Sequence, residues 1–550
     1  MNNNTLIISM TSYPARINGV ASVWESILNQ NVDKNEYHCV LVLAEPEFPD
    51  KVLPKDLQAI IDRGDVELIW YPVNIRSHKK LMPTLKKYPN SPILVVDDDI
   101  TRKEGWLRVF IDDHKKYPND IITGTFQYFL DGDYKFQRMT DFKQKNAGGK
   151  NQVPGIIMNF ARPANGCAGT LYPAGTFTDK RFFDEKKMME MSPTSDESWQ
   201  YAFNIMADKV MRQTSVIFDE SETVVPGSQA VPTSLYKVNK LKYQTIFNDF
   251  AKEFPQFKEK ILERQNRYYF SLTSYPARYK RLPEVITSLL EQTIKPEKIL
   301  LTLTKEEENK LTPELKKFID NGVIEIVCAD EDLKPHKKYY YAMKKYPAEA
   351  IITVDDDIVY AKTMAESLLR GYHSHPNCVI ARRVHKIRKD GNGKILPYKQ
   401  WLYECQTVLT PSFELLATGG AGTLYPPNIL GIDGITPENI KEVLLADDIF
   451  LKHIEMSRGI KVLFVKDVKD EYMKDEETQK LALYKSNCSG GGNDKYIKEL
   501  AKGTKLTAEG SNNTKKEVVL KKYNPKIIHH KRILGIGKPA SKSWKNFFND

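Results

Sequence analysis

The sequence predicts an α/β protein with two tandem domains, each built on a mostly parallel sheet, followed by a basic C-terminal tail. Two observations support this prediction. A set of short motifs occurs twice in the same order, at an offset that shrinks from 262 to 248 residues along the chain. In both copies, short apolar runs alternate with segments of helical periodicity, a pattern typical of parallel strands covered by helices.

The repeat consists of seven matched motifs. Chance would not keep seven matches in order, whereas loop deletions between two copies of one domain would. The pairs are Thr11–Arg16 with Thr273–Arg278, His78–Lys80 with His336–Lys338, Lys86–Pro89 with Lys344–Pro347, Asp97–Ile100 with Asp355–Ile358, Ala168–Pro173 with Ala421–Pro426, Asp196–Glu197 with Asp447–Asp448, and Tyr236–Lys237 with Tyr484–Lys485. We expect domains at 1–250 and 266–505, a helical linker at 251–265 and a tail at 506–550.

Each copy is expected to begin strand, helix, strand, helix, strand, helix, strand, because short continuous apolar runs alternate with longer amphipathic stretches. In the first copy the strands are Leu6–Met10, Cys39–Ala44, Val66–Tyr71 and Ile93–Val96, with helices at Val20–Gln30, Leu57–Arg63 and Lys79–Tyr88. In the second copy the strands are Tyr269–Leu272, Lys298–Leu303, Val323–Val327 and Ala350–Val354, with helices at Leu282–Gln292, Pro313–Asp320 and Lys337–Tyr346.

Charge and cysteine content exclude several classes of protein. Eight of the ten net positive charges lie in the last 40 residues, so the body is nearly neutral and a nucleic-acid-coating role is not expected. There is no apolar run of 18 residues, no secretory signal pattern, and the six cysteines are scattered without a C-x-x-C pair. We therefore expect a cytoplasmic protein with reduced thiols and no nucleic-acid partner.

The two aspartate triplets are the strongest candidate site. Asp97–Asp99 and Asp355–Asp357 each follow an apolar strand, and open α/β sheets bind ligands at the carboxyl ends of their strands. Adjacent carboxylates repel one another, and a divalent cation would neutralise them. In an extended segment the first and third side chains share a face. The alternative is a solvated turn or helix N-cap, which does not explain the triplet in both copies.

A strand that ends in Asp-x-Asp within an α/β half resembles the GT-A fold of nucleotide-sugar glycosyltransferases. The TSYPAR motif at 11–16, the triplets and the ADDIF motif at 446–450 also resemble family-2-like transferases of bacterial surface-polysaccharide loci. The resemblance covers both copies and excludes the tail. It implies two tandem GT-A domains and a divalent metal, Mn²⁺ or Mg²⁺, that bridges the phosphates of a nucleotide sugar, expected to be UDP-linked.

The resemblance also implies roles for residues in the first half of each copy. Asp97 and Asp355 would approach the ribose or the metal, Asp99 and Asp357 would ligate the metal, and Asp98 and Asp356 belong to the nucleotide-sugar site. Tyr13 and Tyr275 would stack on the base, while Arg16 and Arg278 would contact the diphosphate. Lys79 and Lys337, within the His-Lys-Lys motifs, would add positive charge. The alternatives are a Pro-containing turn for TSYPAR and a solvated helix start for His-Lys-Lys.

Two further motifs complete the candidate site. Gly169–Thr170 and Gly422–Thr423 would line the donor and acceptor site, where small residues permit close approach of a sugar; a tight structural turn is the alternative. By the resemblance, Glu197 and Asp448 are expected bases that take the proton of the acceptor hydroxyl, with Asp196 and Asp447 orienting the acceptor. The alternative is a helix N-terminus that favours acids. The first copy reads S-D-E-S-W against A-D-D-I-F, which puts its acceptor geometry or activity in question.

The predicted function is metal-dependent transfer of a hexosyl or similar group to a growing or lipid-linked glycan. Two complete sites predict a bifunctional enzyme of capsule, lipopolysaccharide or exopolysaccharide synthesis. Three alternatives stay open: one active domain beside a degenerate acceptor-binding copy, a nucleotidyltransferase, and a non-catalytic carbohydrate-binding scaffold. Apolar residues interleave the lysines of the tail, which is typical of a segment that binds an anionic membrane surface; a tail in solvent or packed on the second domain is the other interpretation.

Overall fold

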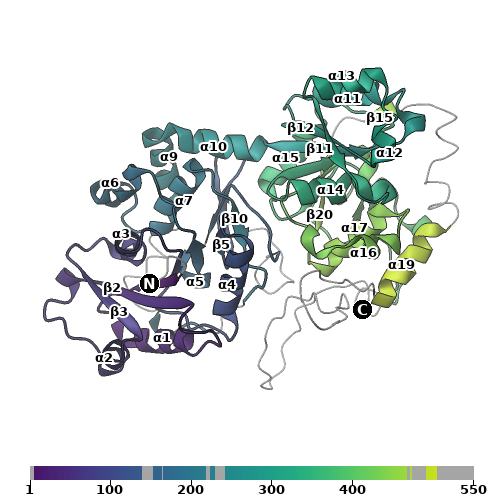
Figure 1. Ribbon diagram of the computed structural model, residues 1–550. Helices are drawn as coiled ribbons and strands as arrows, with labels where there is room; N and C mark the ends of the chain where they lie inside the picture. Colours follow the sequence, from purple (N-terminus) through teal and green to yellow (C-terminus); the bar gives the residue numbers. More distant parts are fainter. Residues whose placement is uncertain are drawn as a thin grey trace. The chain divides into compact units, whose positions relative to one another are not determined.

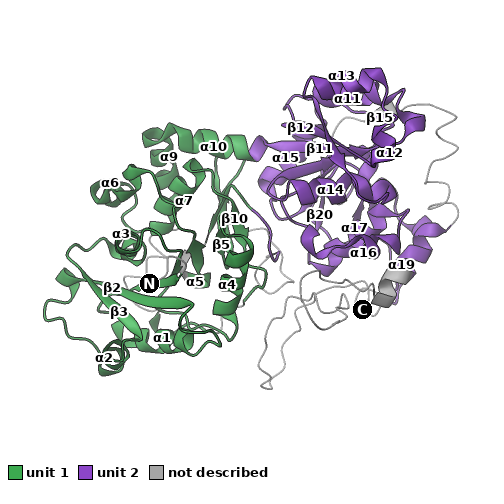
Figure 2. Ribbon diagram, in the orientation of Figure 1, with its two compact units in different colours: residues 1–145, 158–264, 527–532 green, residues 146–157, 265–526, 533–550 purple. Residues whose placement is uncertain are grey.

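The structure is a computed structural model of the 550-residue chain, and it describes residues 5–138, 153–163, 165–218, 223–228, 242–466, 471–472 and 491–503. The chain divides into two compact units (Figure 2). The N-terminal unit contains the described residues up to 138 and from 158 to 264. The C-terminal unit contains residues 153–157 and the described residues from 265 onward. The predicted tail at 506–550 and the pair Tyr236–Lys237 with Tyr484–Lys485 lie outside the described residues.

The N-terminal unit is built on a seven-stranded sheet with the strand order β10-β5-β9-β4-β1-β2-β3 (Figure 1). Neighbouring strands are parallel, except that β9 runs antiparallel to β4 and β5. The strands are β1 (Leu6–Thr11), β2 (Tyr37–Ala44), β3 (Val66–Tyr71), β4 (Ile93–Val96), β5 (Ile121–Thr123), β9 (Thr170–Tyr172) and β10 (Met211–Gln213).

The C-terminal unit repeats this sheet strand for strand, in the order β13-β12-β11-β14-β19-β16-β20, with β19 antiparallel to its neighbours. The strands are β11 (Tyr268–Thr273), β12 (Lys298–Leu303), β13 (Ile324–Cys328), β14 (Ala350–Thr353), β16 (Val379–Ala381), β19 (Thr423–Tyr425) and β20 (Val462–Phe464). Two tandem Rossmann-like α/β domains with mostly parallel sheets are therefore confirmed.

Helices cover both faces of the sheets. Buried residues of α1 (Val20–Leu28), α2 (Lys55–Asp62) and α4 (Trp106–Lys116) form one core with alternate residues of β1, β2 and β4. The helix α3 (Met82–Lys87) lies on the opposite face, where the Thr84 hydroxyl is 2.7 Å from that of Ser9 in β1. The matching helices of the C-terminal unit are α11 (Leu282–Leu290), α13 (Pro313–Asp320), α15 (Met364–Ser374) and α14 (Lys337–Lys345).

The helix predicted at Lys79–Tyr88 differs between the units. In the N-terminal unit the chain forms a 3₁₀ turn at Arg76–Lys80, and α3 begins only at Met82, directly before Pro83. Proline lacks the N–H that an interior helical position needs, so it is accepted in the first turn. The C-terminal unit carries Tyr341 at this position and α14 runs unbroken.

The remaining elements surround these two cores. The helices are α5 (Asn165–Ala168), α6 (Glu185–Met191), α7 (Asp196–Met206), α9 (Tyr243–Glu253), α10 (Pro255–Asn266), α12 (Lys305–Glu308), α16 (Pro437–Lys441), α17 (Asp447–Ser457) and α19 (Gly492–Gly503). The strands are β6 (Phe126–Leu130), β7 (Phe136–Arg138), β8 (Ala161–Pro163), β15 (Ile358–Val359), β17 (Val384–Lys386), β18 (Leu415–Ala417) and β21 (Glu471–Tyr472). Within the described ranges, no helix is both long enough and apolar enough to cross a bilayer.

The strand order places the candidate motifs at one point of each sheet. From β1 the chain adds β2 and then β3 on one side, and then returns to add β4 on the other side of β1. The reversal lies between β1 and β4, and ligands of open α/β sheets bind outside the carboxyl ends of the strands at such a switch point. TSYPAR begins at the end of β1 and the aspartate triplet follows β4, so the fold brings these two motifs together.

We expect Gly169→Ala to destabilise the N-terminal unit by about 2–4 kcal/mol, because a side chain there is both strained and crowded. Gly169 has a φ of +84°, and an added Cβ would lie 2.7 Å from Trp106. The matched control is Gly175→Ala, where φ is +72° but nothing lies within 4 Å of the new atom; it should cost about 1 kcal/mol. Urea denaturation measures both, and equal losses would contradict the packing argument.

Candidate functional site

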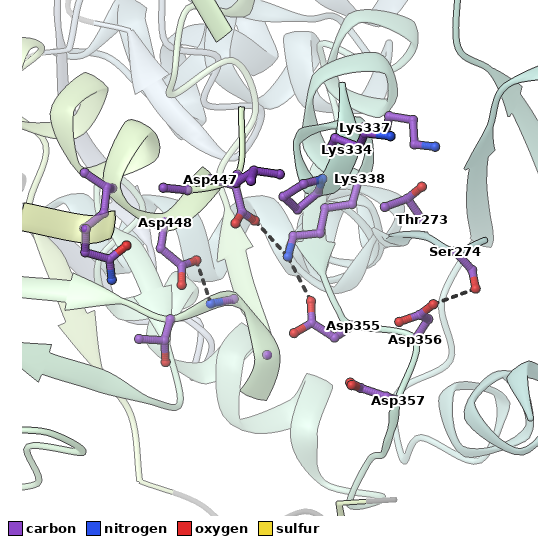
Figure 3. A pocket seen from close by; sticks show the side chains of 18 of the residues that line it. Thr273, Ser274, Lys334, Lys337, Lys338, Asp355, Asp356, Asp357, Asp447 and Asp448 are labelled. Carbon is purple, nitrogen blue, oxygen red and sulfur yellow. Dashed lines mark hydrogen bonds and ion pairs between the residues drawn. The ribbon is translucent and has the colours of Figure 1, made fainter. Parts of the chain in front are cut away.

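A cavity of about 820 Å³ opens at the switch point of the C-terminal unit (Figure 3). Its wall includes residues of five segments that carry or adjoin the predicted motifs and are far apart in the sequence. They are Thr273–Tyr275 after β11, Lys334–Lys338 at the start of α14, Asp355–Asp357 after β14, Thr418–Gly420 before β19, and Leu445–Ile449 at the start of α17. Sequence-predicted residues of the second copy are therefore brought together around one hollow.

The aspartate triplet presents alternate side chains to this cavity. Asp355 and Asp357 are 35% and 29% exposed, whereas Asp356 is only 7% exposed. One oxygen of Asp356 accepts a 2.6 Å hydrogen bond from the Ser274 hydroxyl, and the other pairs with Arg278. Arg278 also lies 3.2 Å from Asp357. The middle aspartate thus anchors the turn after β11, and the first and third remain open to a ligand.

The two open aspartates have opposite pKa shifts. Burial alone would raise the pKa of Asp355, but Lys338 outweighs it and the net shift is downward. Burial and the charge of Asp355 raise the pKa of Asp357 to about 6. This part of the cavity wall therefore carries negative charge that its own cations do not fully neutralise.

Lys338 links the triplet to the acidic pair at the start of α17. Its ammonium group lies 2.8 Å from Asp355 and 2.9 Å from Asp447, and its side chain is 7% exposed. Burial would lower the pKa of Lys338, but the two carboxylates raise it well above the usual value. Two residues earlier, His336 is fully buried, and burial lowers its pKa to about 4. Since these residues are buried, the alternative of a solvated helix start is wrong.

Asp448 is the most perturbed acid of the cavity. Burial and the neighbouring charge of Asp447 raise its pKa to about 7. One carboxylate oxygen accepts a 3.0 Å hydrogen bond from the backbone N–H of Gly419. The glycine pair permits this approach: a Cβ on Gly419 would lie 3.1 Å from the Lys338 ammonium, and one on Gly420 would lie 2.8 Å from Asp355. A carboxyl group with this pKa can exchange a proton near neutral pH.

The N-terminal unit repeats the serine, arginine and lysine contacts of this network. The Ser12 hydroxyl donates to Asp98 at 2.5 Å, and Arg16 lies 2.9 Å from Asp98 and 3.0 Å from Asp99. Lys80 links Asp97 at 2.8 Å to Asp196 at 3.3 Å. Burial and the charge of Asp97 raise the pKa of Asp99 to about 6, as for Asp357. The duplicated motifs therefore build duplicated geometry.

The candidate bases of the two units have different partners. Glu197 accepts a 2.7 Å hydrogen bond from Arg162, a buried residue of β8 whose guanidinium lies over the rings of Tyr128 and Tyr243. In the N-terminal unit, Tyr128 of β6 pairs with Arg162 of β8. In the C-terminal unit, Lys386 of β17 takes the position of Tyr128 and pairs with Leu415 of β18. Leucine thus stands where the N-terminal unit has its arginine.

The arginine near the first aspartate also comes from different positions. In the N-terminal unit it is Arg102, which donates to the carbonyl of Cys167 at 2.7 Å. In the C-terminal unit Tyr360 takes the position of Arg102. Its hydroxyl donates at 2.9 Å to the carbonyl of Gly420, the residue that corresponds to Cys167. In the C-terminal unit the charge near Asp355 comes instead from Arg383, which lines the cavity.

The other predicted nucleotide-site residues lie near the network in each unit. Tyr275 lines the cavity half-buried, with the Arg278 guanidinium 5.3 Å from its ring centre, and Arg16 lies 5.8 Å from the ring centre of Tyr13. Lys337 lines the cavity but pairs with Glu307 at 2.6 Å, and Lys79 likewise pairs with Glu47.

The glycine-threonine motifs do not match their predicted place. Thr170 and Thr423 are fully buried in central strands of the sheets, and Gly422 and Thr423 are not part of the cavity wall. Gly169 and Gly422 have φ values of +84° and +89°, and each packs against a helix, through Trp106 and Met364. The donor and acceptor role expected for Gly169, Thr170, Gly422 and Thr423 is therefore corrected to a structural turn. Gly419 and Gly420, three and two residues before Gly422, reach the cavity instead.

Sequence reasoning missed several residues of the network. Lys80 and Lys338 are the last residues of the His-Lys-Lys motifs and were given no role of their own, although they are the buried cations that connect the acids of each network. Ser12 and Ser274 were present in TSYPAR and carried the signal of repetition. Arg162 and Arg383 occur in one copy only, so the repeat could not identify them.

The donor set limits how a metal could bind. Among the described residues, no group of three or more His, Cys, Asp and Glu side chains is arranged to hold a metal ion. In the C-terminal unit the triplet offers two exposed carboxylates, Asp355 and Asp357, whereas in the N-terminal unit Asp97 is 30% exposed and Asp99 only 4%. One or two exposed carboxylates are thus available in each triplet. That number fits Mg²⁺ or Mn²⁺ in nucleotide enzymes, where one or two carboxylates and the substrate phosphates complete the coordination.

Comparisons with known proteins show no family for this chain. No family model and no curated protein matches the chain. Similar solved structures include S. aureus TarS 1–349, at 14% identity and a TM-score of 0.28 over 47% of this chain and 69% of that one. The complexes of that fragment with UDP and UDP-GlcNAc match at 16% and 14% identity, with TM-scores of 0.29 and 0.27, covering 47% of this chain and 69% and 70% of theirs.

We expect Asp448→Asn to remove a loss of stability that the wild-type protein shows between about pH 4 and pH 7. The pKa of Asp448 is about 7 in the folded state and about 3.9 in an unfolded chain, so the folded state binds more protons in this window. Stability then falls as pH rises. Urea denaturation near both ends of the window measures the change.

The control is Glu314→Gln, which removes an exposed acid of α13 and should keep the wild-type pH dependence. An Asp448→Asn protein with the same pH dependence as the wild type would contradict the raised pKa.

Proposed function

We propose that this protein is a nucleotide-sugar glycosyltransferase with a reaction site in each unit. One observation carries the proposal. Lys338 joins Asp355, at the sheet's switch point, to Asp447 at the start of α17, so a ligand-binding carboxylate group and a candidate base face one cavity. Transfer of a glycosyl group needs both: a place for the diphosphate, and an acid that can take a proton from the acceptor.

The nucleotide would bind at the end of β11. Tyr275 is half-buried in the cavity wall and offers an aromatic face to a base. Arg278, fixed by Asp356 and Asp357, lines the same cavity and would contact the diphosphate. Tyr13 and Arg16 are the equivalent residues of the N-terminal unit.

A divalent cation fits this site. Asp355 and Asp357 would hold it in the C-terminal unit, and Asp97 and Asp99 in the N-terminal unit. The raised pKa values of Asp357 and Asp99 reflect negative charge that a bound cation would relieve. When bound, such a cation would supply Lewis-acid stabilisation of the negative charge on the leaving diphosphate.

Asp448 is the proposed base of the C-terminal site. The acceptor oxygen forms a bond to the anomeric carbon while the bond from that carbon to the diphosphate oxygen breaks. Asp448 takes the acceptor's hydroxyl proton, and the nucleoside diphosphate leaves with the electron pair of the broken bond. Asp447 and Lys338 orient the acceptor and hold the developing charge. In the N-terminal site Glu197 takes the base role and Asp196 the orienting role, with Arg162 fixing the Glu197 carboxylate.

The proposed biological role is assembly of a bacterial capsule, lipopolysaccharide or exopolysaccharide by two transfers. The different partners of Glu197 and Asp448 support two sites of different specificity. A cytoplasmic site of action, docking of the tail on an anionic membrane and a lipid-linked acceptor remain predictions from the sequence, because residues 506–550 lie outside the described chain.

The metal and nucleotide assignments are tested by isothermal titration with uridine diphosphate, with and without Mn²⁺. We expect Mn²⁺-dependent binding at two sites. Asp355→Asn with Asp357→Asn should abolish one site and leave the other, and Asp97→Asn with Asp99→Asn should do the reverse. Each double variant is the matched control for the other. Unchanged stoichiometry in both would contradict the metal assignment.

The base assignment is tested by release of nucleoside diphosphate from a panel of nucleotide sugars with acceptor oligosaccharides. In a protein whose N-terminal triplet is inactivated, Asp448→Asn should lower kcat by a factor of about 10²–10⁴ while uridine diphosphate still binds. The remaining activity of the unmodified C-terminal site should rise with pH through about 7 as Asp448 ionises. Full activity in the Asp448→Asn protein would exclude it as the base.

A further inference from the structure

The C-terminal cavity has an aromatic wall that the reaction as proposed does not use. His385, Tyr398 and Tyr403 line the cavity beside Glu404. The ring centres of His385 and Tyr403 are 4.5 Å apart in a perpendicular arrangement, and those of Tyr398 and Tyr403 are 5.8 Å apart. Tyr403 is 39% exposed. We call these three side chains the aromatic shelf.

The shelf is held rigidly from behind. The backbone N–H of Tyr398 donates to Asp494 of α19 at 2.8 Å, and the buried Trp401 ring packs 4.8 Å from that of Tyr398. His385 accepts from the backbone N–H of Glu404 through Nδ1 at 3.1 Å, and burial lowers its pKa to about 4. The shelf therefore presents uncharged rings in fixed positions, as preformed ligand pockets do.

Strand pairing puts the shelf next to the candidate base. His385 belongs to β17, in which Val384 pairs with Ala417 of β18. Two residues after Ala417, the N–H of Gly419 binds Asp448. Arg383 and His385 share one face of the strand, and both line the cavity. Because Arg383 lies near Asp355, the shelf continues the part of the cavity wall that contains the triplet.

We propose that the aromatic shelf is the acceptor-sugar subsite of the C-terminal unit, where Tyr403 stacks on a pyranose ring. A pyranose has one face of C–H groups and a rim of hydroxyls. An aromatic ring matches the first, and the Glu404 carboxylate beside it can accept hydrogen bonds from the second. A sugar stacked here would direct a hydroxyl toward Asp448. This proposal rests on the proposed function and assigns its acceptor class.

The shelf also distinguishes the two units. The repeat offset of 258 residues, which relates the triplets, places Gln127 where the C-terminal unit has His385. The Gln127 side chain donates to the Cys167 sulfur at 3.3 Å, so an amide takes the place of the imidazole ring. The subsite is therefore assigned to the C-terminal unit, where the described residues form the shelf.

The test is saturation-transfer NMR with a panel of methyl glycopyranosides of glucose, galactose, mannose, N-acetylglucosamine and N-acetylgalactosamine, in the presence of uridine diphosphate and Mn²⁺. At least one glycoside should receive saturation at its ring C–H protons. Tyr403→Ala should weaken its binding about tenfold, while Tyr403→Phe, which keeps the ring, should bind as the wild type does. Leu409→Ala is the control, since Leu409 is 64% exposed in the same segment and is not part of the cavity wall.

Two results would overturn the subsite: no glycoside receives saturation from the wild-type protein, or Tyr403→Ala and Leu409→Ala give equal signals. Loss of uridine diphosphate binding in Tyr403→Ala would also overturn it, because the shelf would then belong to the nucleotide. Failure of the proposed function is a different outcome. There, uridine diphosphate does not bind the wild-type protein, and the ring-dependent glycoside signal would then indicate a carbohydrate-binding role.

Discussion

A buried lysine between two carboxylates is the interaction on which each unit depends. Lys338 and Lys80 are almost fully buried, and a buried ammonium group is tolerated only when acids compensate for the loss of water. The compensating acids come from two distant segments, the loop after a central strand and the start of a late helix. Satisfying this one charge therefore fixes the position of both segments at the switch point of the sheet.

That constraint also shapes the chemistry of the site. Each lysine neutralises only part of the acidic cluster around it, so the acids that it does not contact directly ionise with difficulty. Asp357 and Asp448 have raised pKa values for this reason, in addition to burial. The residual negative charge is suited to a cation, and the raised pKa of Asp448 is suited to proton transfer. Structural and chemical roles are thus inseparable in this network.

The two units show which parts of the network can vary. The lysine, the serine and arginine after the first strand and the three aspartates are the same in both. The groups around the last acid differ: Arg162 holds Glu197, while Leu415 stands in the equivalent place and Gly419 holds Asp448. Arg102 and Arg383 supply similar charge from unrelated positions. Variation thus lies around the last acid and beside the first aspartate, whereas the serine and arginine contacts of the middle aspartate are the same in both units.

The sequence by itself determined the two-domain α/β fold, the strands and helices of the first half of each copy, and the motifs at the switch point. It could do so because apolar periodicity and repeated motifs can be recognised in the linear sequence without knowledge of tertiary contacts. It could not tell which lysine of the pair Lys337 and Lys338 contacts the aspartates, or which of Gly419 and Gly422 reaches the cavity. Nearby residues of one motif acquire different surroundings only when the chain has packed. Arg162 and Arg383 are absent from the equivalent positions of the other copy, and Gln127 stands where the C-terminal unit has His385. Only the tertiary structure decided their roles, because burial and proximity depend on segments more than 30 residues apart meeting around one charge.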